Sequence, residues 1–512
     1  MVYFKSQRDN TTLFPLMDFI KRSKPLKILF VGAEAVPFVK IGGLGEFLYA
    51  LPKALSELGH DVRVMIPKYA TIDAEKFPMT TVIEGLMVSD PDHEDIVCNV
   101  KKYENNNPME PINYFLENQE YYEKHSSVYG YDDDAARWAL LCRGTIEFMR
   151  SYKEWRPDII VANDWQGGLL PNYMKCEYKD DPVISKIAAV FVIHNLYFQG
   201  MFDHYCISEL DYDDGKSAVP PITDSRLLKT NFMSRGIRFA DIISTVSPNY
   251  AREITTPEYG EFLDTLLQER RSHLYGILNG ISYDRYNPET NPYVEFKYNA
   301  KSLGERRKNK KILQQKFNLD ERNDVFMVAI VSRLNEQKGF DLVTETIKPL
   351  LDNFDFQFVV LGSGESKYLS FFDELDKMYP QVATHLLNDA ILPHVIYSGA
   401  DMIVIPSRFE PSGLTQMEAM RYGMVPLARK TGGLADSVKD YNPQKQTGTG
   451  FLFEKYDQYA FFGTFIRAFE TYKYPTIWQG IQKRAMVANF SWEKSAKEYV
   501  ELFKRALSQF NS

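Results

Sequence analysis

The chain has 512 residues, more than one hydrophobic core accommodates, so two large domains are expected. Its formal net charge of -8 disfavours general nucleic-acid binding, and its 44% hydrophobic residues are typical of a globular protein. No apolar run is long enough to cross a bilayer, and the 4 cysteines have no paired metal spacing. The sequence therefore predicts a cytoplasmic protein without a nucleic-acid or membrane partner.

Residues 1–26 are polar and basic, apart from a short apolar patch at Leu13–Ile20 that Pro15 and Asp18 interrupt. A signal peptide needs a more apolar core, so these residues are predicted to form an N-terminal extension. From residue 27 onward, short apolar runs alternate with helical patterns, which predicts parallel sheets covered by helices. The strands predicted in the first half are Lys27–Gly32, Asp61–Pro67, Asp158–Ala162, Ala188–Ile193 and Asp241–Val246.

A second series of apolar runs follows the turn-rich segment Gly276–Pro288, which predicts a domain boundary there. The expected fold class is α/β, with two Rossmann-like, doubly wound parallel-sheet domains at 27–280 and 281–490 facing a central cleft. Residues 491–512 are predicted to form a helix that returns to the first domain. The strands predicted in the second half are Val325–Val331, Phe356–Leu361, Asp401–Pro406 and Val425–Arg429.

Glycine-rich stretches follow predicted strands in both halves and open into predicted helices. They lie at Lys40–Leu44, within Pro406–Leu414 and at Lys430–Leu434. Such turns bind anions, because backbone N–H groups point outward and the helix dipole favours negative charge. The alternative is a tight turn in which glycine supplies a positive φ. Anion-binding edges on two domains favour a cleft enzyme that holds a diphosphate between them.

Charged side chains also lie where predicted strands end. Arg333 and Lys338 follow one such strand and could neutralise a leaving diphosphate without a metal; the alternative is two solvated surface cations. Glu410 and Glu418 are eight residues apart, about two helical turns. Glu410 lies in a turn after a predicted buried strand, an unusual place for a chance carboxylate. This position favours a functional role.

Other polar residues support two interpretations each. His194, in F-V-I-H-N, is either a satisfied core group or a catalytic one. Asp164, in N-D-W-Q, is either a helix cap or a catalytic group. The run Asp132–Asp134 resembles an acidic metal motif, but a helical pattern follows it, so helix N-capping is predicted. No metal site is expected.

Together these motifs resemble those of the bacterial-type glycogen/starch synthases. That family has the GT-B fold, belongs to glycosyltransferase family 5, retains the anomeric configuration and uses ADP-glucose. The resemblance runs from about Lys27 to the C-terminus, and the joint order and spacing of its motifs are specific. The motifs are Lys40–Glu46, Ala50–Leu55, Asn163–Gln166, His194–Phe202, Thr245–Ile254, Gly276–Ile281, Ser332–Gly339, Pro406–Leu414 and Lys430–Val438.

The resemblance implies transfer of glucose from ADP-glucose to the 4-hydroxyl at the non-reducing end of an α-1,4-glucan, with no cofactor or metal. Arg333 and Lys338 would hold the diphosphate, and Glu410 would contact the donor sugar. His194 and Asp164 would act at the reacting centre. No carboxylate nucleophile is evident, so same-face attack is expected. The implied donor-binding residues are Lys40, Gly42, Gly43, Asn195, Asn279, Gly413, Leu414, Glu418 and the Thr431, Gly432, Gly433 turn, whose N–H groups would face phosphate.

Several positions depart from the family pattern, and they leave alternatives open. One alternative is a same-fold retaining glucosyltransferase that uses UDP-glucose or another acceptor. Another is a glucan-binding pseudoenzyme; a phosphorylase is disfavoured, because no pyridoxal-phosphate lysine site is recognisable. The departures are Ile41 for threonine, Glu46 for aspartate, Ser282 for aspartate, Asn388 for a base-stacking aromatic residue, Ser412 for cysteine and Glu418 for a residue that is often aromatic.

Overall fold

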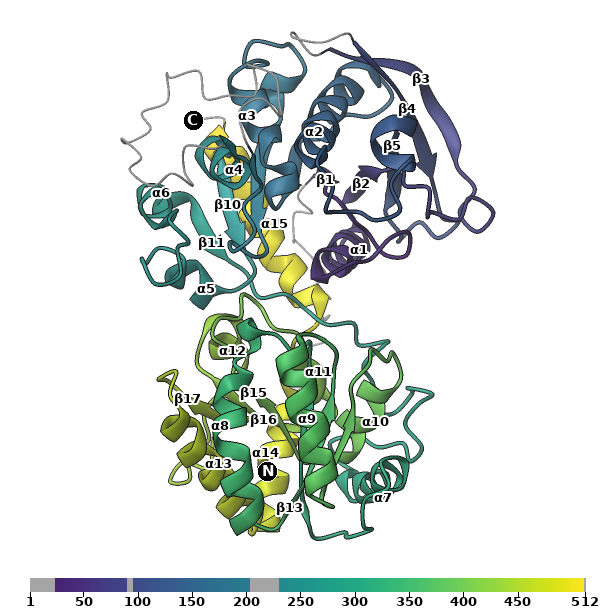
Figure 1. Ribbon diagram of the computed structural model, residues 1–512. Helices are drawn as coiled ribbons and strands as arrows, with labels where there is room; N and C mark the ends of the chain where they lie inside the picture. Colours follow the sequence, from purple (N-terminus) through teal and green to yellow (C-terminus); the bar gives the residue numbers. More distant parts are fainter. Residues whose placement is uncertain (1–23, 90–94, 203–229, 511–512) are drawn as a thin grey trace, which may run out of the picture.

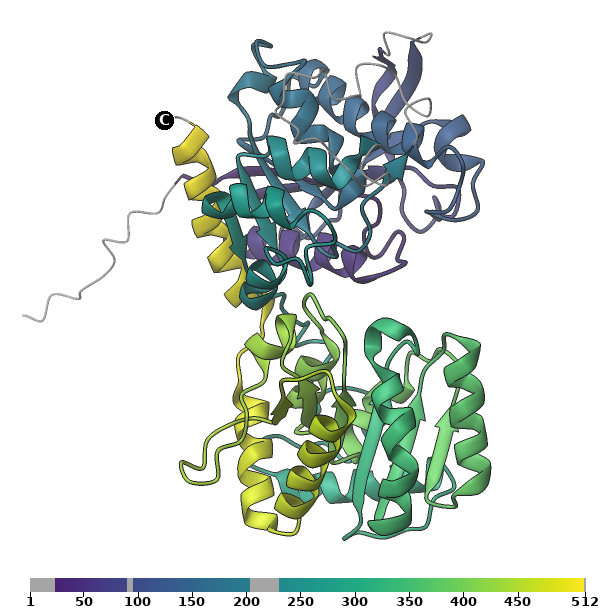
Figure 2. The ribbon, with the colours of Figure 1, turned by 60° about the vertical axis from the view of Figure 1, so that its left-hand side comes forward.

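Two large sheets, one mostly parallel and one fully parallel, organise the two halves of the chain (Figure 1). The computed structural model describes residues 24–89, 95–202 and 230–510. The first domain is the upper one in Figure 1 and the second the lower one, and the turned view in Figure 2 keeps them apart as two bodies joined at one side. The expected α/β class with two Rossmann-like domains is confirmed.

The first domain contains a nine-stranded sheet in the order β11-β10-β7-β6-β1-β2-β5-β4-β3. All neighbours are parallel except β3–β4 and β4–β5, which form an antiparallel edge. The strands are β1 (Lys27–Val31), β2 (Asp61–Pro67), β3 (Thr80–Val88), β4 (Ile96–Tyr103), β5 (Ile112–Glu117), β6 (Ile159–Asn163), β7 (Ala188–Ile193), β10 (Ile242–Thr245) and β11 (Leu274–Gly276). Between them lie α1 (Gly43–Glu57), α2 (Asp134–Ser151), α3 (Leu169–Lys175), α4 (Phe232–Phe239), α5 (Pro248–Glu253) and α6 (Asp264–Glu269), with the small pair β8 (Met201–Phe202) and β9 (Thr230–Asn231).

The second domain has a six-stranded parallel sheet in the order β14-β13-β12-β15-β16-β17. Successive residues of β12 pack into two separate cores: Phe326 and Val328 into one, Met327 and Ala329 into the other. Because side chains alternate along a strand, this sheet is buried on both faces. Its strands are β12 (Phe326–Val331), β13 (Phe356–Leu361), β14 (Val382–His385), β15 (Met402–Ile405), β16 (Val425–Arg429) and β17 (Phe451–Phe453). Its helices are α7 (Arg306–Lys316), α8 (Phe340–Asn353), α9 (Ser366–Met378), α10 (Leu392–Gly399), α11 (Thr415–Arg421), α12 (Gly432–Ser437), α13 (Gln458–Tyr472) and α14 (Pro475–Val487).

The chain crosses between the domains twice, and the two crossings run side by side. Ile281 forms a parallel bridge with Ser491, and the Ile281 N–H donates to the Phe490 carbonyl at 2.8 Å. Helix α15 (Trp492–Phe510) then lies along the first domain (Figures 1 and 2). Its Phe503 ring meets Phe30 of β1 with ring centroids 6.4 Å apart. The last helix is thereby part of the first domain's core.

All nine strands predicted from apolar runs exist, with ends within one residue of the prediction.

The prediction that Asp132–Asp134 cap the following helix is wrong, because none of their side chains makes a cap hydrogen bond. Asp133 occupies the cap position of α2, but its side chain bonds His125 at 3.0 Å and makes no cap hydrogen bond. Asp134 instead accepts from the Gly130 N–H at 2.9 Å and from Arg137. These carboxylates fix the loop before the helix.

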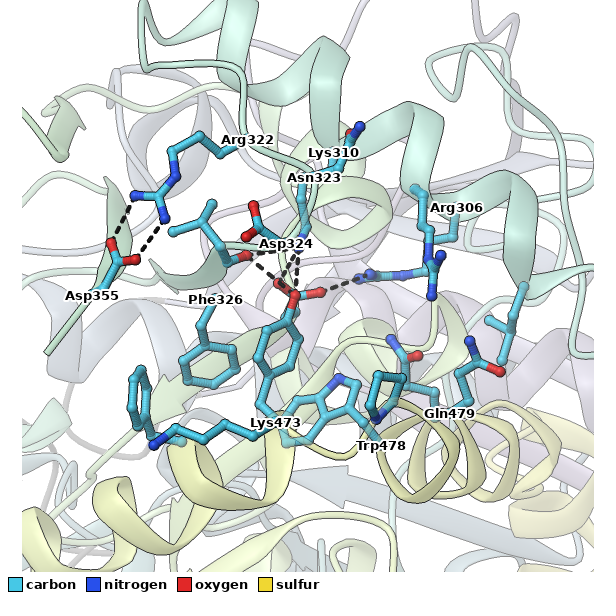
Figure 3. Close-up of a pocket in the computed structure, with 18 residues that line it drawn as sticks. Arg306, Lys310, Arg322, Asn323, Asp324, Phe326, Asp355, Lys473, Trp478 and Gln479 are labelled. Carbon is cyan, nitrogen blue, oxygen red and sulfur yellow. Dashed lines mark hydrogen bonds and ion pairs between the residues drawn. The ribbon is translucent and has the colours of Figure 1, made fainter.

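A cavity of about 570 Å³ opens at the amino ends of the second sheet, where β12, β13 and β15 begin (Figure 3). Its charges are paired with one another. Buried Asp401 meets Lys310 at 2.6 Å and Arg306 at 3.7 Å. At the rim, Arg322 and Asp355 form an exposed pair with two hydrogen bonds of 2.7 and 2.5 Å (Figure 3). In parallel sheets ligands bind at the carboxyl ends of strands, so this cavity lies at the end of the sheet opposite the usual binding edge.

The two ion pairs of this cavity predict different effects on stability. Asp401→Ala leaves the buried Lys310 ammonium without its carboxylate, so the free energy of unfolding should fall by roughly 3–5 kcal/mol. Asp355→Ala removes only an exposed partner and should cost about 1 kcal/mol or less. Urea unfolding of both variants measures the difference. Equal losses in the two would contradict the assigned burial of the Asp401 pair.

Candidate active site

The two domains enclose a second cavity of about 540 Å³ between the carboxyl ends of their sheets. The first domain supplies the loops after β1, β6, β7, β10 and β11, and the second supplies the loops after β12 and β15. This is the position at which open α/β sheets bind ligands. The predicted site residues that line it are Gly42, Gly43, Asp164, His194, Asn195, Asn279, Arg333, Lys338, Glu410, Gly413 and Leu414.

The glycine turn after β1 is built around a buried carboxylate. Glu34 is 2% exposed and accepts hydrogen bonds from the Ile41 N–H and, at 3.0 Å, from the Gly42 N–H. Gly42 has φ −140°, so the alternative in which glycine supplies a positive φ does not hold at this residue. The expectation that the amides of this turn point outward is therefore corrected at Ile41 and Gly42. Glu34 itself lines the cavity, and only its position just after the strand pointed to it.

Lys40 lies beside this cavity and not in its lining. Its ammonium bonds the Glu46 carboxylate, which also accepts from Arg285 of the second domain at 3.1 Å. The longer side chain of glutamate at position 46 thus reaches two cations on two domains. The pair Lys40–Glu46 is partly exposed, with 45% of the Lys40 side chain open to solvent. Lys40 can exchange this partner for an anion in the cleft at small cost.

Lys338 and Glu410 form the polar centre of the second domain's half of the site. The Lys338 ammonium donates to Glu410 Oε2 at 2.6 Å, and the Ser407 hydroxyl donates to the same oxygen at 2.9 Å. Glu410 is 6% exposed. Arg333 is exposed on the cavity wall, and its guanidinium has no hydrogen-bond or ion-pair partner within the described ranges. One paired and one unpaired cation therefore face the cleft.

Asp164 and His194 of the first domain lie on the side of the cavity opposite Arg333 and Lys338. Asp164 has a strained φ of 51°, and its Oδ1 accepts from the His194 N–H at 2.7 Å. It makes no side-chain cap hydrogen bond, so the helix-cap alternative is wrong. Burial raises the pKa of Asp164 to about 7 and lowers the pKa of His194 to about 3. The His194 Nε2 lies 3.0 Å from Asn163 Oδ1 and its ring packs on Phe47.

Three buried polar atoms in the lining residues lack any hydrogen-bond partner within the part of the chain that the structure describes. They are Asn279 Oδ1, Ser412 Oγ and Gln166 Oε1, on residues that are 8%, 8% and 5% exposed. Buried polar groups are nearly always satisfied, so these three atoms are exceptions among the residues that line the cavity. Sequence reasoning missed Gln166 and did not assign Ser412 a contact.

The turn after β16 differs from its expected role. The Gly432 N–H donates to both oxygens of Glu253, at 2.9 and 3.0 Å, and the Thr431 hydroxyl contacts the same carboxylate at 3.1 Å. The Gly433 N–H donates to the Glu410 carbonyl at 2.9 Å. Glu253 belongs to α5 of the first domain, so the Gly432 amide links the domains, while the Gly433 amide is bonded within the second domain. Neither amide is left for a phosphate. None of the three turn residues lines the cleft cavity.

Glu418 lies behind the lining as well. Its carboxylate accepts from the Tyr397 hydroxyl at 3.1 Å, and burial raises its pKa. Asn388, at the position expected for a base-stacking aromatic ring, accepts from the Ser363 hydroxyl at 2.5 Å.

Within the described residues, no group of three or more His, Cys, Asp or Glu side chains is placed to hold a metal ion. No helix in those residues is long and apolar enough to cross a membrane.

Two family models match the chain in the order of its domains. Residues 27–269 match the starch synthase catalytic domain, and residues 311–480 match the glycosyl transferases group 1. The glycogen synthase of Thermotoga maritima is 40% identical over 490 residues, which is 94% of this chain and 99% of that protein. The glycogen synthase of Desulforudis audaxviator is 37% identical over 497 residues, covering 95% and 97%.

Solved structures agree with these relatives. The catalytic domain of starch synthase IV from Arabidopsis thaliana, bound to ADP and acarbose, has a TM-score of 0.83 and 31% identity, covering 94% of this chain and 100% of that one. Sucrose-phosphate synthase from Thermosynechococcus elongatus, at 16% identity and a TM-score of 0.57, shares the fold alone. The two-domain architecture is GT-B. The chain is a glycosyltransferase that belongs to the bacterial-type glycogen/starch synthase family.

Proposed function

We propose that this glycogen synthase transfers glucose from ADP-glucose to the 4-hydroxyl at the non-reducing end of an α-1,4-glucan, with retention at the anomeric carbon. One observation carries the proposal: Arg333 and the Lys338–Glu410 pair face Asp164 and His194 across a single cavity. The relative from Arabidopsis thaliana binds ADP and acarbose, which supports a nucleotide donor and a glucan acceptor. The enclosed volume of about 540 Å³ suits a sugar nucleotide.

The cations of the second domain stabilise the charge of the leaving diphosphate. Negative charge builds on the departing diphosphate as the glycosidic bond breaks, and fixed cations in an enclosed site stabilise it. Lys338 is held by Glu410 at 2.6 Å, so its position is set before the donor arrives. Arg333 offers its planar fork of donors, which suits phosphate oxygens. We infer that these two groups take the place of a metal ion.

Each carboxylate that lines the cavity accepts a hydrogen bond through at least one oxygen, a positioning role that fits same-face attack without a covalent glycosyl-enzyme. Glu34 accepts from the amides of the glycine turn, Asp164 from the His194 amide, and Glu410 from Lys338. The acceptor hydroxyl then attacks on the face from which the diphosphate leaves, and a leaving phosphate oxygen takes the proton.

His194 contributes as a neutral ring. Because its pKa falls to about 3, the imidazole is uncharged at physiological pH. A neutral ring can hydrogen-bond a sugar hydroxyl without repelling the positive charge of an oxocarbenium-like transition state. Asp164 contributes a charged group. Its ionised carboxylate accepts from the backbone N–H of His194 and places negative charge near the reacting centre. Burial shifts the pKa of both side chains.

Removal of the unpaired cation should slow transfer without affecting folding. Arg333→Ala should lower kcat by roughly 100-fold, about 3 kcal/mol, as for loss of another charge-stabilising donor. Arg408→Ala is the matched control, since Arg408 lies on the neighbouring loop and pairs with Asp341 outside the cavity. Initial rates of both variants and of the wild type are measured with and without excess EDTA. Loss of activity with EDTA alone would contradict the metal-free role of Arg333.

Asp164 predicts a pH profile with opposite signs for activity and stability. Its ionised form is the active one, so kcat/KM should fall as pH drops through about 7. Its folded pKa lies above the unfolded value, so its contribution to stability is present below about pH 4 and lost as pH rises through 7. Asp164→Asn should therefore be inactive, yet gain stability over the wild type as pH rises from 4 to 7.

The control for that variant is Asp132→Asn, a change at an exposed carboxyl of the same domain. Thermal melting and initial rates at a series of pH values measure both quantities. An unchanged acid limb in an active Asp164→Asn enzyme would exclude Asp164 as the titrating group. Parallel pH dependence of stability in the wild type and Asp164→Asn would show that its pKa is not raised by folding.

The donor is tested directly by transfer of labelled glucose to glycogen from ADP-glucose and UDP-glucose in parallel. The expected result is strong transfer from ADP-glucose alone. Transfer mainly from UDP-glucose would contradict the adenine assignment and direct attention to Asn388, which hydrogen-bonds Ser363 where a stacking ring is expected. No transfer from either donor, with binding of glucan retained, would point to the pseudoenzyme alternative.

A further inference from the structure

Helix α5 of the first domain packs on α12 of the second, at the junction of the two domains (Figure 1). The Glu253 side chain at the end of α5 accepts from the Gly432 N–H at 2.9 Å and contacts the Thr431 hydroxyl at 3.1 Å. The side-chain amide of Asn249 donates to the same carboxylate at 2.7 Å. The Asn249 N–H in turn donates to Asp436 of α12 at 2.7 Å. The Glu253 carboxylate is therefore held by its own helix and directed at the other domain.

The turn that Glu253 holds supports the backbone of Glu410. The Gly433 N–H, next along the chain from Gly432, donates to the Glu410 carbonyl at 2.9 Å and to the Pro411 carbonyl at 3.2 Å. Gly432 has a φ of +45°, and a Cβ atom built on it would lie 1.9 Å from the Glu410 carbonyl oxygen. Only glycine permits two backbones to approach this closely. A displacement of the turn is therefore passed on to Glu410.

A second contact from α5 reaches the same segment directly. Ser247 is buried and caps α5 by accepting from the Tyr250 N–H at 3.1 Å, while its hydroxyl donates to the Pro411 carbonyl at 2.8 Å. The Tyr250 hydroxyl accepts from the Leu196 N–H at 3.1 Å, two residues after His194. This short helix is therefore hydrogen-bonded to loops on both sides of the cleft.

We propose that Glu253 and Ser247 are positioning residues, which place Glu410 for glucosyl transfer only when the two domains are in contact. Separation of the domains removes both contacts from the backbone around Glu410, and closure restores them. Domain closure can complete a catalytic site in this way, and a small displacement of a group at the reacting centre lowers the rate strongly. This inference rests on the proposed function, because it assumes that Glu410 acts on the donor in that reaction.

The test separates catalysis from donor binding. Glu253→Ala removes the support of the turn, so kcat for transfer from ADP-glucose to glycogen should fall roughly ten- to hundredfold, as for a misplaced catalytic group. The affinity for ADP, measured by titration calorimetry, should stay within about twofold, because ADP lacks the glucose on which Glu410 acts. Glu253→Gln keeps an oxygen for the Gly432 N–H, and its kcat should stay within about threefold of the wild type.

Ser247→Gly tests the direct contact. It removes the hydroxyl that holds Pro411, yet glycine remains an acceptable N-cap, so the start of α5 is kept. Its kcat should fall roughly three- to tenfold, the value of about one hydrogen bond. Because both residues act on one backbone segment, the double variant Glu253→Ala with Ser247→Gly should lose less than the product of the two single effects.

The matched control is Asp457→Ala. Asp457 also holds backbone N–H groups through its carboxylate, accepting from Tyr459 and Ala460 at 3.0 Å each, and it lies outside the cavity lining. Thermal melting should show a lower Tm for Asp457→Ala and Glu253→Ala alike. Only Glu253→Ala should lose kcat at a temperature at which both are folded. If Glu253→Ala does not fold, Ser247→Gly decides the matter, because its helix keeps a cap.

The outcomes distinguish this inference from the proposed function. Wild-type enzyme that transfers from ADP-glucose, with kcat unchanged in Glu253→Ala and Ser247→Gly, overturns the positioning role and leaves the function intact. Equal losses of kcat and of ADP affinity also overturn it, since the second domain's site would then be damaged as a whole. Single effects that multiply in full in the double variant overturn the shared action on one segment. Wild-type enzyme that transfers glucose from neither ADP-glucose nor UDP-glucose overturns the proposed function and this inference with it.

Discussion

The site depends on the rule that all strands of a parallel sheet end at the same edge. Each domain collects its loops at one edge, and the two crossings at Ile281 and Ser491, bridged to each other, hold these edges face to face. Helix α15 returns to the first domain and packs on β1 through Phe503 and Phe30, so the second crossing is anchored at both ends. The cleft is therefore a consequence of topology, and its chemistry is a matter of which residues follow which strands.

Carboxylates inside the protein occupy amide groups that a substrate anion could have used. Glu34 takes the amides of Ile41 and Gly42, and Glu253 takes the amide of Gly432. Both carboxylates pre-organise a glycine turn at the edge of the cleft. Under the proposed function, the charge of the diphosphate is therefore left to the side chains of Arg333 and Lys338. Side-chain cations have longer reach than backbone amides, and they can follow the donor as the leaving group separates.

The strands that were predicted from sequence are those buried on both faces, such as β7 and β13, because continuous apolar runs leave little choice. The antiparallel edge β3–β5 was missed, since β3 is largely exposed and its apolar residues are interrupted. Arg333, Lys338 and Glu410 could be proposed from their place after strands. The partners that define their chemistry could not. Glu253 and Gly432 are 179 residues apart, and the orphan oxygen of Gln166 exists only once the cavity around it is built.

The polar character of the contacts between the domains bears on how the cleft can work. Besides Glu253 and Gly432, the Ser247 hydroxyl donates to the Pro411 carbonyl at 2.8 Å, and the Asn249 N–H donates to Asp436 at 2.7 Å. Arg285 reaches Glu46 at 3.1 Å on another side. Water can replace such hydrogen bonds at little net cost, unlike a packed apolar interface. Under the proposed function, such contacts would let the domains separate to admit a glucan and close again, while the covalent crossings at Ile281 and Ser491 would keep the two edges in register.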